Sequence, residues 1–498
     1  MNAVRGLNVL VLAVILAAFC LQALFALPRL SATTDEPVHL AAGFSYWQTR
    51  DFRMNQEHPP LAKLIAGLPL LFIHPKFDTN SNDWERGAEY PFGFTFLYQN
   101  DADRLLFWSR TAMVALAAIG LIVTFLWARD LFGMPAGLFA AGLYAFSPNL
   151  LAHGTLVTTD VPLAVFTILT LYLFWKGSDV CAGLALGAAM ACKFSGAALP
   201  ILLVAFSFVR YGRSALKRIV TTGIAALLVI EAAFLFSESP LAYFRNISLV
   251  NANHVQQYPF YLFGQLHPNG WWYYFLAAFA LKATVPTLLM IFAATIHTKN
   301  GLINRWGEII LITSISFYIL VISIGADQIG IRYLLPILPL LFVWTSRIVP
   351  SLATSRFGVS ILAILLFWQA WAATRAFPNY IPYFNELAGG PARGPALLDD
   401  SNVDWGQSVK LAGEYVRAHR LDNVNLYTFS PFDNPSYYGL PANIPPSEAF
   451  ERLVKRHPAP GVYIISAHYV ARMRNVSPAW SKYQPVDRIG ESLLVYAF

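Results

Sequence analysis

The sequence predicts an α-helical protein that crosses a membrane many times and ends in a small α/β domain. Of its 498 residues, 56% are hydrophobic and only 13% are charged, whereas soluble proteins carry about 25% charged residues. Mean hydropathy is +0.49. Apolar stretches of the length that a bilayer core requires, about 20 residues each, recur up to residue 375, and strand-like segments follow in residues 376–498.

Eleven apolar stretches are predicted to be membrane-spanning helices. They lie near 7–27, 104–128, 135–152, 161–176, 180–194, 196–210, 219–236, 271–296, 307–324, 333–348 and 357–375. Lys193 interrupts the stretch 180–210, which we interpret as a tight helical hairpin that turns at the membrane face. The first stretch exceeds a signal-peptide core and lacks a cleavage site of small residues, so we expect it to remain as a helix.

The charges predict which side of the membrane each loop faces. With the N-terminus inside, the cytoplasmic loops contain most of the basic residues, as the positive-inside rule expects. Ten of the 28 acidic residues lie in the first outer loop (28–103) and eleven lie in residues 376–498. We therefore expect a multi-pass plasma membrane (bacterial inner membrane) protein whose chemistry is extracytoplasmic. There is no basic patch interleaved with aromatic residues, so no nucleic-acid partner is expected.

The two outer segments are predicted to have secondary structure of their own. In the first, residues 37–49 have the pattern of an amphipathic helix lying along the membrane, and residues 61–73 have that of a second interfacial helix after the Pro59-Pro60 break. In the second, Asp404 is positioned to cap a helix. Its expected elements are a helix over 405–420, strands at Val424–Phe429 and Gly461–Ser466, a helix begun by Ser447 between them, and a last strand at Leu493–Phe498.

Asp35 and Glu36 follow the first apolar stretch directly. One explanation is that they cap the helix that begins at Pro37, because acidic residues favour a helix N-terminus. The other explanation is functional. If one carboxyl is partly buried beside the other, repulsion and desolvation raise its pKa and suit it to proton transfer. Asp35 is our choice for the base that accepts or orients the acceptor proton.

A second cluster reads Glu57-His58-Pro59-Pro60-Leu61-Ala62-Lys63. The proline pair holds the backbone extended and presents its neighbours rigidly. An ordinary surface turn with a snorkelling lysine explains this pattern. Alternatively, Lys63 or His58 contacts a phosphate at the depth of the lipid headgroups, with Glu57 in support.

Other charged residues lie where the membrane makes an unpaired charge costly. Arg110 lies about 9 Å deeper than Arg104 by helical rise, so it needs an anionic partner, either a lipid phosphate or an internal salt bridge. Asp160 is positioned either to cap the fourth helix or to join the site. Lys193 and Arg332 are lone cations of outer hairpins, which favours a role in binding, with snorkelling as the alternative.

The tail contains the polar run Asp399-Asp400-Ser401-Asn402-Val403-Asp404-Trp405-Gly406-Gln407. Turn and capping residues explain this run, and acceptor contact is the alternative. It is too short for an ordered calcium loop. The three cysteines, Cys20, Cys181 and Cys192, lie in apolar stretches without a paired spacing. We therefore expect neither a metal site nor a cofactor.

Taken together, Asp35-Glu36, His58-Pro-Pro-Leu-Ala-Lys63 and Arg110 resemble the motifs of protein O-mannosyltransferases. They are also similar to those of the lipid A aminoarabinose transferases, whose Glu-Lys-Pro-Pro stands where Glu57-His58-Pro59-Pro60 stands here. Thr159-Asp160-Val-Pro162, Lys193-Phe-Ser and Trp272-Tyr-Tyr followed by Lys282 extend the likeness through residues 1–375. The large lumenal β-trefoil domain of the eukaryotic mannosyltransferases is absent from this chain.

The resemblance implies a GT-C glycosyltransferase with a transmembrane domain over residues 1–375 and an extracytoplasmic domain over 376–498. It implies an undecaprenyl- or dolichyl-type phosphate sugar as donor, membrane lipid as surroundings, and a protein, lipid or glycan as acceptor. By this likeness Asp35 is the catalytic carboxylate, with Glu36 and Asp160 beside it. Arg110, Lys63, Arg332 and Lys193 then hold the donor phosphate. The expected mechanism is inverting.

Two other classes of protein remain as alternatives. A polytopic transporter or lipid flippase places ionisable groups at the midplane, often in two symmetric halves; only Lys282 and Glu231 favour it. A scaffold whose outer domain binds cell-wall polymers is the third possibility. The charges cluster towards one face and no internal symmetry is evident, which favours the enzyme.

Overall fold

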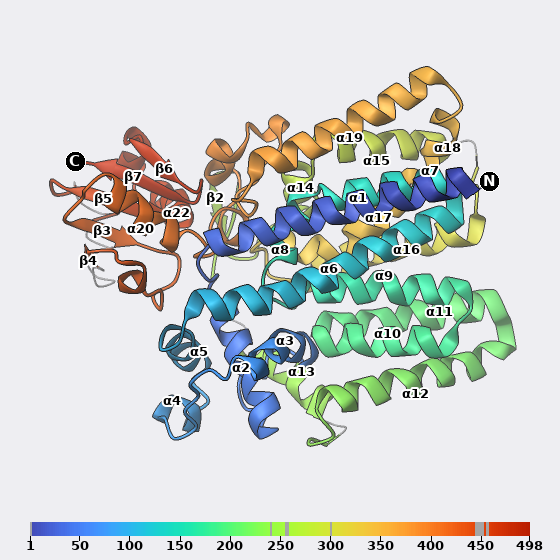
Figure 1. Cartoon of the computed structure of the whole chain (residues 1–498), viewed down its shortest axis with the longest axis horizontal. Coiled ribbons are helices and arrows are strands. Elements are labelled where there is room, and N and C mark those ends of the chain that lie inside the picture. Colours follow the sequence, from blue (N-terminus) through green and yellow to red (C-terminus); the bar gives the residue numbers. More distant parts are fainter. Residues whose placement is uncertain (1, 240–241, 254–257, 299–300, 444–452, 455–457) are drawn as a thin grey trace.

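The computed structural model describes residues 2–239, 242–253, 258–298, 301–443, 453–454 and 458–498. Long helices run side by side, with the N-terminus at one end of the bundle and the small sheet of the tail at the other (Figure 1). The main helices of the bundle are α1 Asn2–Ala26, α6 Ala102–Phe132, α7 Met134–Ala145, α9 Asp160–Lys176, α10 Asp179–Cys192, α11 Leu199–Tyr211, α12 Ala215–Ala233, α14 Tyr274–Lys282, α15 Val285–His297, α16 Arg305–Gly325, α17 Leu338–Thr345 and α19 Arg356–Ala376.

The bundle is that of a membrane protein, but the predicted number of spans is not confirmed. Within the described ranges, six helices are long and apolar enough to cross a membrane, or up to seven if α14 and α15, bent by 117°, count as one span. Each predicted stretch still contains a helix or a helix pair. Several are shorter than expected because polar residues end them early: Lys193 follows α10, and Ser147 ends the third stretch at α7 by capping α8 (Pro148–Gly154).

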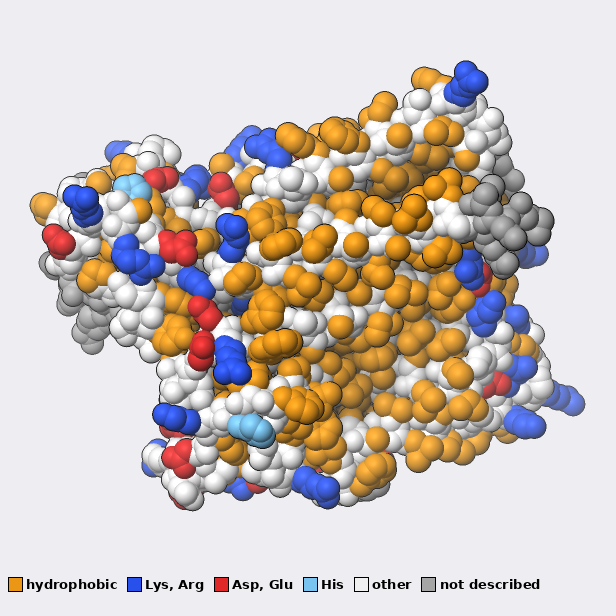
Figure 2. All heavy atoms as spheres, in the orientation of Figure 1, with side chains coloured by type: hydrophobic (Ala, Val, Ile, Leu, Met, Phe, Trp, Pro, Cys, Tyr) orange, Lys and Arg blue, Asp and Glu red, His pale blue; other side chains and the backbone are white. Residues whose placement is uncertain are grey.

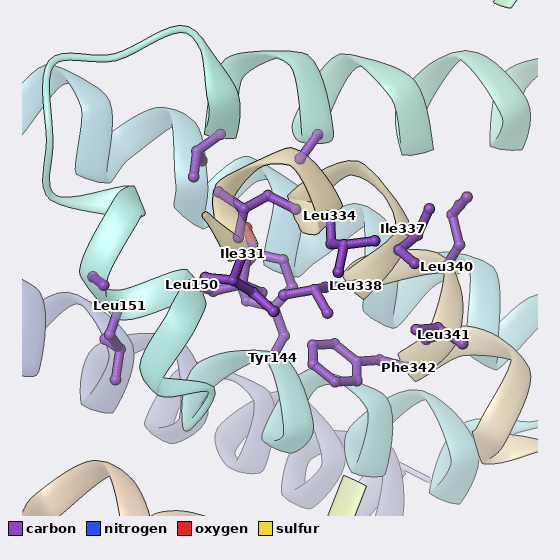
Figure 3. Packing of buried hydrophobic residues seen from close by; sticks show 14 of the residues in the cluster. Tyr144, Leu150, Leu151, Ile331, Leu334, Ile337, Leu338, Leu340, Leu341 and Phe342 are labelled. Atoms are coloured by element: carbon purple, nitrogen blue, oxygen red, sulfur yellow. The ribbon is translucent and has the colours of Figure 1, made fainter. Parts of the chain in front are cut away.

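The outward-facing surface of the bundle is apolar, as contact with a lipid bilayer requires. The α1 helix exposes Val9, Val14 and Phe25 at 60% or more, and an apolar band covers the visible face of the helices (Figure 2). Inside, α7, α8, α17 and the 3-10 helix η6 (Ile331–Ile337) pack together around Tyr144, Leu150 and Leu334 (Figure 3). Ile331 and Leu334 belong to this core, so it anchors the 3-10 helix that contains Arg332.

The first outer loop forms a helical layer at the end of the bundle opposite the N-terminus (Figure 1). Its elements are α2 Glu36–Thr49, α3 Leu61–Gly67, η2 Leu68–Phe72, α4 Asn82–Glu85 and α5 Glu89–Tyr98. The two expected helices are therefore present. However, α2 is not amphipathic on a membrane surface, because all its residues from Glu36 to Tyr46 are buried. It is covered by α3 and α5, and Gly43 lies so close to the Lys63 carbonyl that an added Cβ would be 1.9 Å from that oxygen.

The tail folds as an α/β unit beside this layer. Its sheet has the order β4-β3-β5-β7-β6, in which β3 is parallel to β4 and β5, and β7 is antiparallel to β5 and β6. The three predicted strands are confirmed. The bounds are β3 Val424–Tyr427, β4 Ala442–Asn443, β5 Val462–Ser466, β6 Asp487–Ile489, β7 Leu493–Ala497, α20 Val409–Ala418 and α22 Ala467–Val476, with a separate hairpin of β1 Phe260–Leu262 and β2 Gln265–His267.

The role of Asp404 and the start of the helix after it differ from the sequence prediction, and one further predicted helix lies outside the described residues. Asp404 caps no helix: α20 begins at Val409, and the Asp404 carboxylate accepts hydrogen bonds from the Gly406 N–H at 3.0 Å and the Ser466 hydroxyl at 2.5 Å. Burial raises its pKa to about 6. The helix predicted to begin at Ser447 falls within residues 444–452, which the structure does not describe.

Lys282 has a clear structural partner. Its ammonium donates to the carbonyl oxygens of Ile381 at 2.8 Å and Asn402 at 2.6 Å. It therefore joins the kink between α14 and α15 to the polar run of the tail. The partner that an intramembrane lysine requires is backbone oxygen, which removes one of the two features that favoured a transporter.

Candidate active site

Asp35 does not cap the helix that follows it. Its carboxylate makes no capping bond at the start of α2 and instead accepts a hydrogen bond from Nη1 of Arg332 at 3.1 Å. The two residues are 297 positions apart. At 21%, the Asp35 side chain is the most exposed member of the cluster described below. The carboxylate is therefore both paired and accessible.

Arg332 connects Asp35 with a second ion pair. Its Nη1 lies 4.0 Å from Oδ2 of Asp160, and Oδ1 of Asp160 accepts a 2.5 Å hydrogen bond from the Lys193 ammonium. Asp160 begins α9 without acting as its cap, and Lys193 lies just after α10. The four residues form two carboxylates and two cations in one place, which we call the site cluster.

The polar run of the tail holds Arg332 from both sides. Asn402 accepts from the Ile331 N–H at 3.0 Å, and the Ser401 hydroxyl donates to the Ile329 carbonyl at 2.7 Å. Gly330 has to be glycine here, because an added Cβ would lie 2.3 Å from the Ser401 hydroxyl. The guanidinium of Arg332 lies 4.3 Å from the centroid of the Trp405 ring, which adds a cation–π contact.

The same run also fixes the segment that leads into Asp35. The Ser31 N–H donates to the Gln407 carbonyl at 3.0 Å, and the Thr34 N–H donates to the Trp405 carbonyl at 2.9 Å. These strand-like bonds place the segment that leads into Asp35 beside Trp405, whose ring Arg332 also contacts. The run is thus part of the site's architecture, although its contact with an acceptor stays a prediction.

One nitrogen in the site cluster has no hydrogen-bond partner among the described residues. Nε of Arg332 is buried and has no hydrogen-bond partner, although a buried guanidinium normally uses its donors. Nδ1 of His39, His58 and His153 is buried and unpartnered in the same way. Burial, with Lys63 second, lowers the pKa of His39 to about 3, so this ring is neutral at physiological pH and offers polar contact without charge.

Glu36 and Arg110 form a pair of their own, away from this cluster. Nε and Nη2 of Arg110 donate to the Glu36 carboxylate at 2.8 and 2.6 Å, and the other N–H groups donate to the carbonyls of Leu27, Leu30 and Ser31. Their side chains are 1% and 0% exposed. The internal salt bridge that the sequence left as an alternative is therefore what the structure contains.

This pair corrects the expectation that the two adjacent carboxyls act on each other. Glu36 also accepts from the N–H groups of Thr33 and Val157 at 2.8 and 2.9 Å. Burial alone would raise its pKa, but Arg110 and these hydrogen bonds hold the pKa of Glu36 below its ordinary value. Asp35 and Glu36 point to different cations because consecutive residues at a helix start project in different directions.

Lys63 is enclosed by the first outer loop itself. Its ammonium donates to the Asn55 carbonyl and the His58 carbonyl, both at 2.7 Å, and to the Tyr46 hydroxyl at 2.9 Å. The residue is 1% exposed. Glu57 contributes charge nearby, and the ring of His58 lies 5.1 Å from that of His39. In this geometry the ammonium of Lys63 holds the loop together, and its contact with a donor phosphate stays a prediction.

Lys63→Met is therefore expected to loosen the loop. The variant keeps the length of the side chain but leaves the Asn55 and His58 carbonyls without their donor, which costs about 1–3 kcal/mol for each buried group. We expect a lower thermal unfolding midpoint in detergent and faster proteolysis between α2 and α3. Lys76→Met, an exposed change in the same loop, is the control; equal stability of the two variants would contradict the enclosure of Lys63.

Sequence reasoning identified the four members of the site cluster but missed their neighbours. His39 was expected in a helix along the membrane surface, Trp405 stood only within the polar run, and His153 was not singled out. No local signal marks them, because they meet only after three distant segments pack together. Within the described part of the chain, no group of three or more His, Cys, Asp or Glu side chains is arranged to hold a metal ion.

One family model matches part of the chain. Residues 102–237 match the family model of dolichyl-phosphate-mannose-protein mannosyltransferases. Among solved structures, ArnT from Cupriavidus metallidurans in the apo state has a TM-score of 0.49 at 14% identity over 99% of this chain and 98% of that one. The archaeal oligosaccharyltransferase AglB from Archaeoglobus fulgidus, in complex with an inhibitory peptide and a dolichol-phosphate, has a TM-score of 0.48 at 10% identity, covering 98% and 74%.

A further solved structure is the protein O-mannosyltransferase Pmt1-Pmt2 complex of S. cerevisiae, bound to the sugar donor, with a TM-score of 0.34 at 20% identity, covering 51% of this chain and 38% of that one. No curated protein matches the sequence. The matched region 102–237 contains Asp160 and Lys193 of the site cluster. The resemblance to the protein mannosyltransferases that the sequence predicts is thus confirmed, over the helices from α6 to α12.

Proposed function

We propose that this protein is a membrane glycosyltransferase that moves a sugar from a polyprenyl phosphate to an acceptor hydroxyl. The observation that carries the proposal is the site cluster. It places a partly exposed carboxylate, Asp35, beside two cations, Arg332 and Lys193, at the end of the bundle that carries the first outer loop. A base and a phosphate-binding pair are the two groups that this transfer requires. The description of the matching family names a dolichyl-phosphate donor, which supports the lipid phosphate.

The transfer is inverting in this proposal. The acceptor oxygen attacks the anomeric carbon of the donor sugar, and its proton passes to Asp35. The bond between that carbon and the phosphate oxygen breaks, and the lipid phosphate leaves with the electron pair. Arg332 and Lys193 stabilise the charge that develops on the leaving oxygen, so the chain's own side chains supply both the base and the electrostatic stabilisation.

In the resting protein these groups are paired with each other. Asp35 occupies Nη1 of Arg332, and Asp160 occupies Lys193. A phosphate that enters has to take over Arg332, which releases Asp35 towards the acceptor. Nε of Arg332, buried and unpartnered in the resting protein, is a further donor for the phosphate once Asp35 is released. Arg110 and Lys63 were expected to hold the phosphate. In this proposal they are structural, because their N–H groups donate to protein oxygens.

The active site is proposed to face outside the cytoplasm. The first outer loop and the tail lie at the same end of the bundle, opposite the N-terminus (Figure 1). Basic residues such as Arg213, Lys217 and Arg218 lie at the other end, between α11 and the start of α12. The positive-inside rule places that end in the cytoplasm.

Arg332→Gln is expected to abolish sugar transfer. The change removes the positive charge but keeps a hydrogen-bonding side chain, and loss of one preorganised charge costs about 10²–10³ in kcat. The measurement is release of labelled sugar from a polyprenyl-phosphate donor by the purified protein in liposomes. Arg218→Gln, which breaks an Arg–Asp pair with Asp179 of similar length at 3.0 Å, is the control at the other end of the helices.

A wild-type protein that transfers no sugar from mannosyl, aminoarabinosyl or other polyprenyl-phosphate donors would contradict the proposed class. An Arg332→Gln protein with normal donor affinity and rate would contradict the assigned role alone. Testing a protein, a lipid and a glycan acceptor in parallel then identifies which hydroxyl is used.

A further inference from the structure

A surface groove runs between the first outer loop and α6, on the side of that helix away from Arg110. It has a volume of about 580 Å³, within the range of about 300–1,000 Å³ that small-molecule sites occupy. One wall is η2, with Leu68 and Phe72, and the other is α6, with Trp108. These three side chains are 45%, 82% and 47% exposed, so the groove is open to the surroundings of the protein.

The spacing of residues along α6 explains which of its side chains line the groove. Arg104, Trp108, Ala112 and Ala115 all line the groove, and their spacings of three or four residues place them on one face of a helix. The two alanines make this face hollow, whereas Trp108 forms a ridge. Arg110 lies on a different face of α6 and is 1% exposed against Glu36. The groove and the Glu36–Arg110 pair are therefore on different faces of α6.

The chemistry of the groove is apolar along its length and cationic at one end. Arg104 is exposed in the first turn of α6, the end of the helix that carries the first outer loop. Its backbone N–H donates to the Asp101 side chain. Its guanidinium makes no salt bridge with any of the described residues. A hydrocarbon chain beside one basic residue at the membrane surface is the arrangement that an anionic lipid fits.

We propose that this groove binds a bilayer phospholipid with an anionic headgroup, whose phosphate lies on Arg104 and whose acyl chain lies between η2 and Trp108. The occupant is a bilayer lipid and not the sugar donor, because the donor's phosphate is proposed to lie at Arg332 and Lys193, which do not line the groove. The lipid contacts η2 and α6 together and so holds the outer loop, which carries Asp35, against the bundle. Its binding does not depend on sugar transfer.

The test uses the full-length protein and two vesicle compositions, pure phosphatidylcholine and phosphatidylcholine with phosphatidylglycerol. Native mass spectrometry counts the lipids retained after extraction from each. We expect preferential retention of one phosphatidylglycerol by the wild type. Ala112→Phe should fill the groove and abolish this retention, and Arg104→Gln should weaken it about fivefold, as expected for about 1 kcal/mol from one basic residue at the surface.

Ile119→Phe is the matched control, because Ile119 is an exposed residue of α6 beyond the groove. It should retain phosphatidylglycerol as the wild type does. Equal retention of both lipids, or loss of retention in the control as well, would overturn the proposal. Loss of polyprenyl-phosphate binding in Ala112→Phe, with phosphatidylglycerol retained, would overturn it too, since the groove would then hold the donor chain. Sugar transfer is not a readout here, so failure leaves the proposed function intact.

Discussion

Asp35→Asn is expected to reduce sugar transfer by about 10²–10⁴-fold, the factor that a positioned general base contributes. The amide has nearly the same shape as the carboxylate and can still contact Arg332, but it cannot accept the acceptor's proton. Because it removes one negative charge beside Arg332, it should not weaken donor binding. The expected pattern is therefore a large fall in kcat with a donor Kd that is unchanged or tighter. Both values come from single-turnover transfer and donor titration in liposomes.

Asp160→Asn is the informative comparison for this result. Asp160 is only 3% exposed and is held by Lys193, so it has little access to an acceptor. Its loss should disturb the position of Lys193 and weaken donor binding, with a smaller fall in kcat. If Asp160→Asn removes kcat and Asp35→Asn does not, the base is Asp160. Asp103→Asn, which breaks the exposed pair with Lys410, should change neither value.

The fold was predictable from the sequence as far as composition and periodicity determine it. The apolar stretches, the break at Lys193, the helix near residues 37–49 and the three strands of the tail all have local causes. The burial of α2 has no local cause. The residues that cover it belong to α3 and α5, and the sequence pattern of residues 37–49 contains no information about them. The number of spans is not confirmed either, since bends and polar residues shorten α7, α10 and α14 below the length of a bilayer crossing.

Four of the charged residues that the sequence singles out lie together in the structure, but their pairing could not be predicted. Charges in apolar surroundings need partners, which correctly singled out Arg110, Lys193 and Arg332. Which partner each charge finds depends on contacts between segments far apart in the sequence. Asp35 and Glu36 are adjacent, yet one pairs across 297 positions with Arg332 and the other across 74 with Arg110. Motif resemblance places such residues in one site, and the geometry separates the partly exposed Asp35–Arg332 pair from the enclosed Glu36–Arg110 pair.

That separation leads to the second large effect: Arg110→Met should destabilise the protein itself. The change leaves the Glu36 carboxylate buried without its cation, and breaking a buried ion pair from one side costs about 3–5 kcal/mol. Removing both charges together, as in Arg110→Met with Glu36→Gln, leaves no uncompensated ion. The double variant should therefore be more stable than Arg110→Met alone. Thermal unfolding in detergent, followed by tryptophan fluorescence, measures all three proteins.

Comparing Arg110→Met with Arg332→Gln distinguishes a structural arginine from one that acts in sugar transfer. Arg332→Gln should unfold near the wild-type temperature and lose transfer, because its partner Asp35 is 21% exposed and water can solvate it. Arg110→Met should lose stability first, and any loss of activity should be restored in the double variant to the extent that the fold is restored. A stable Arg110→Met protein that fails to bind the donor would return Arg110 to the phosphate site. The chemistry would then belong to the Glu36 pair, with Asp35 and Arg332 as its support.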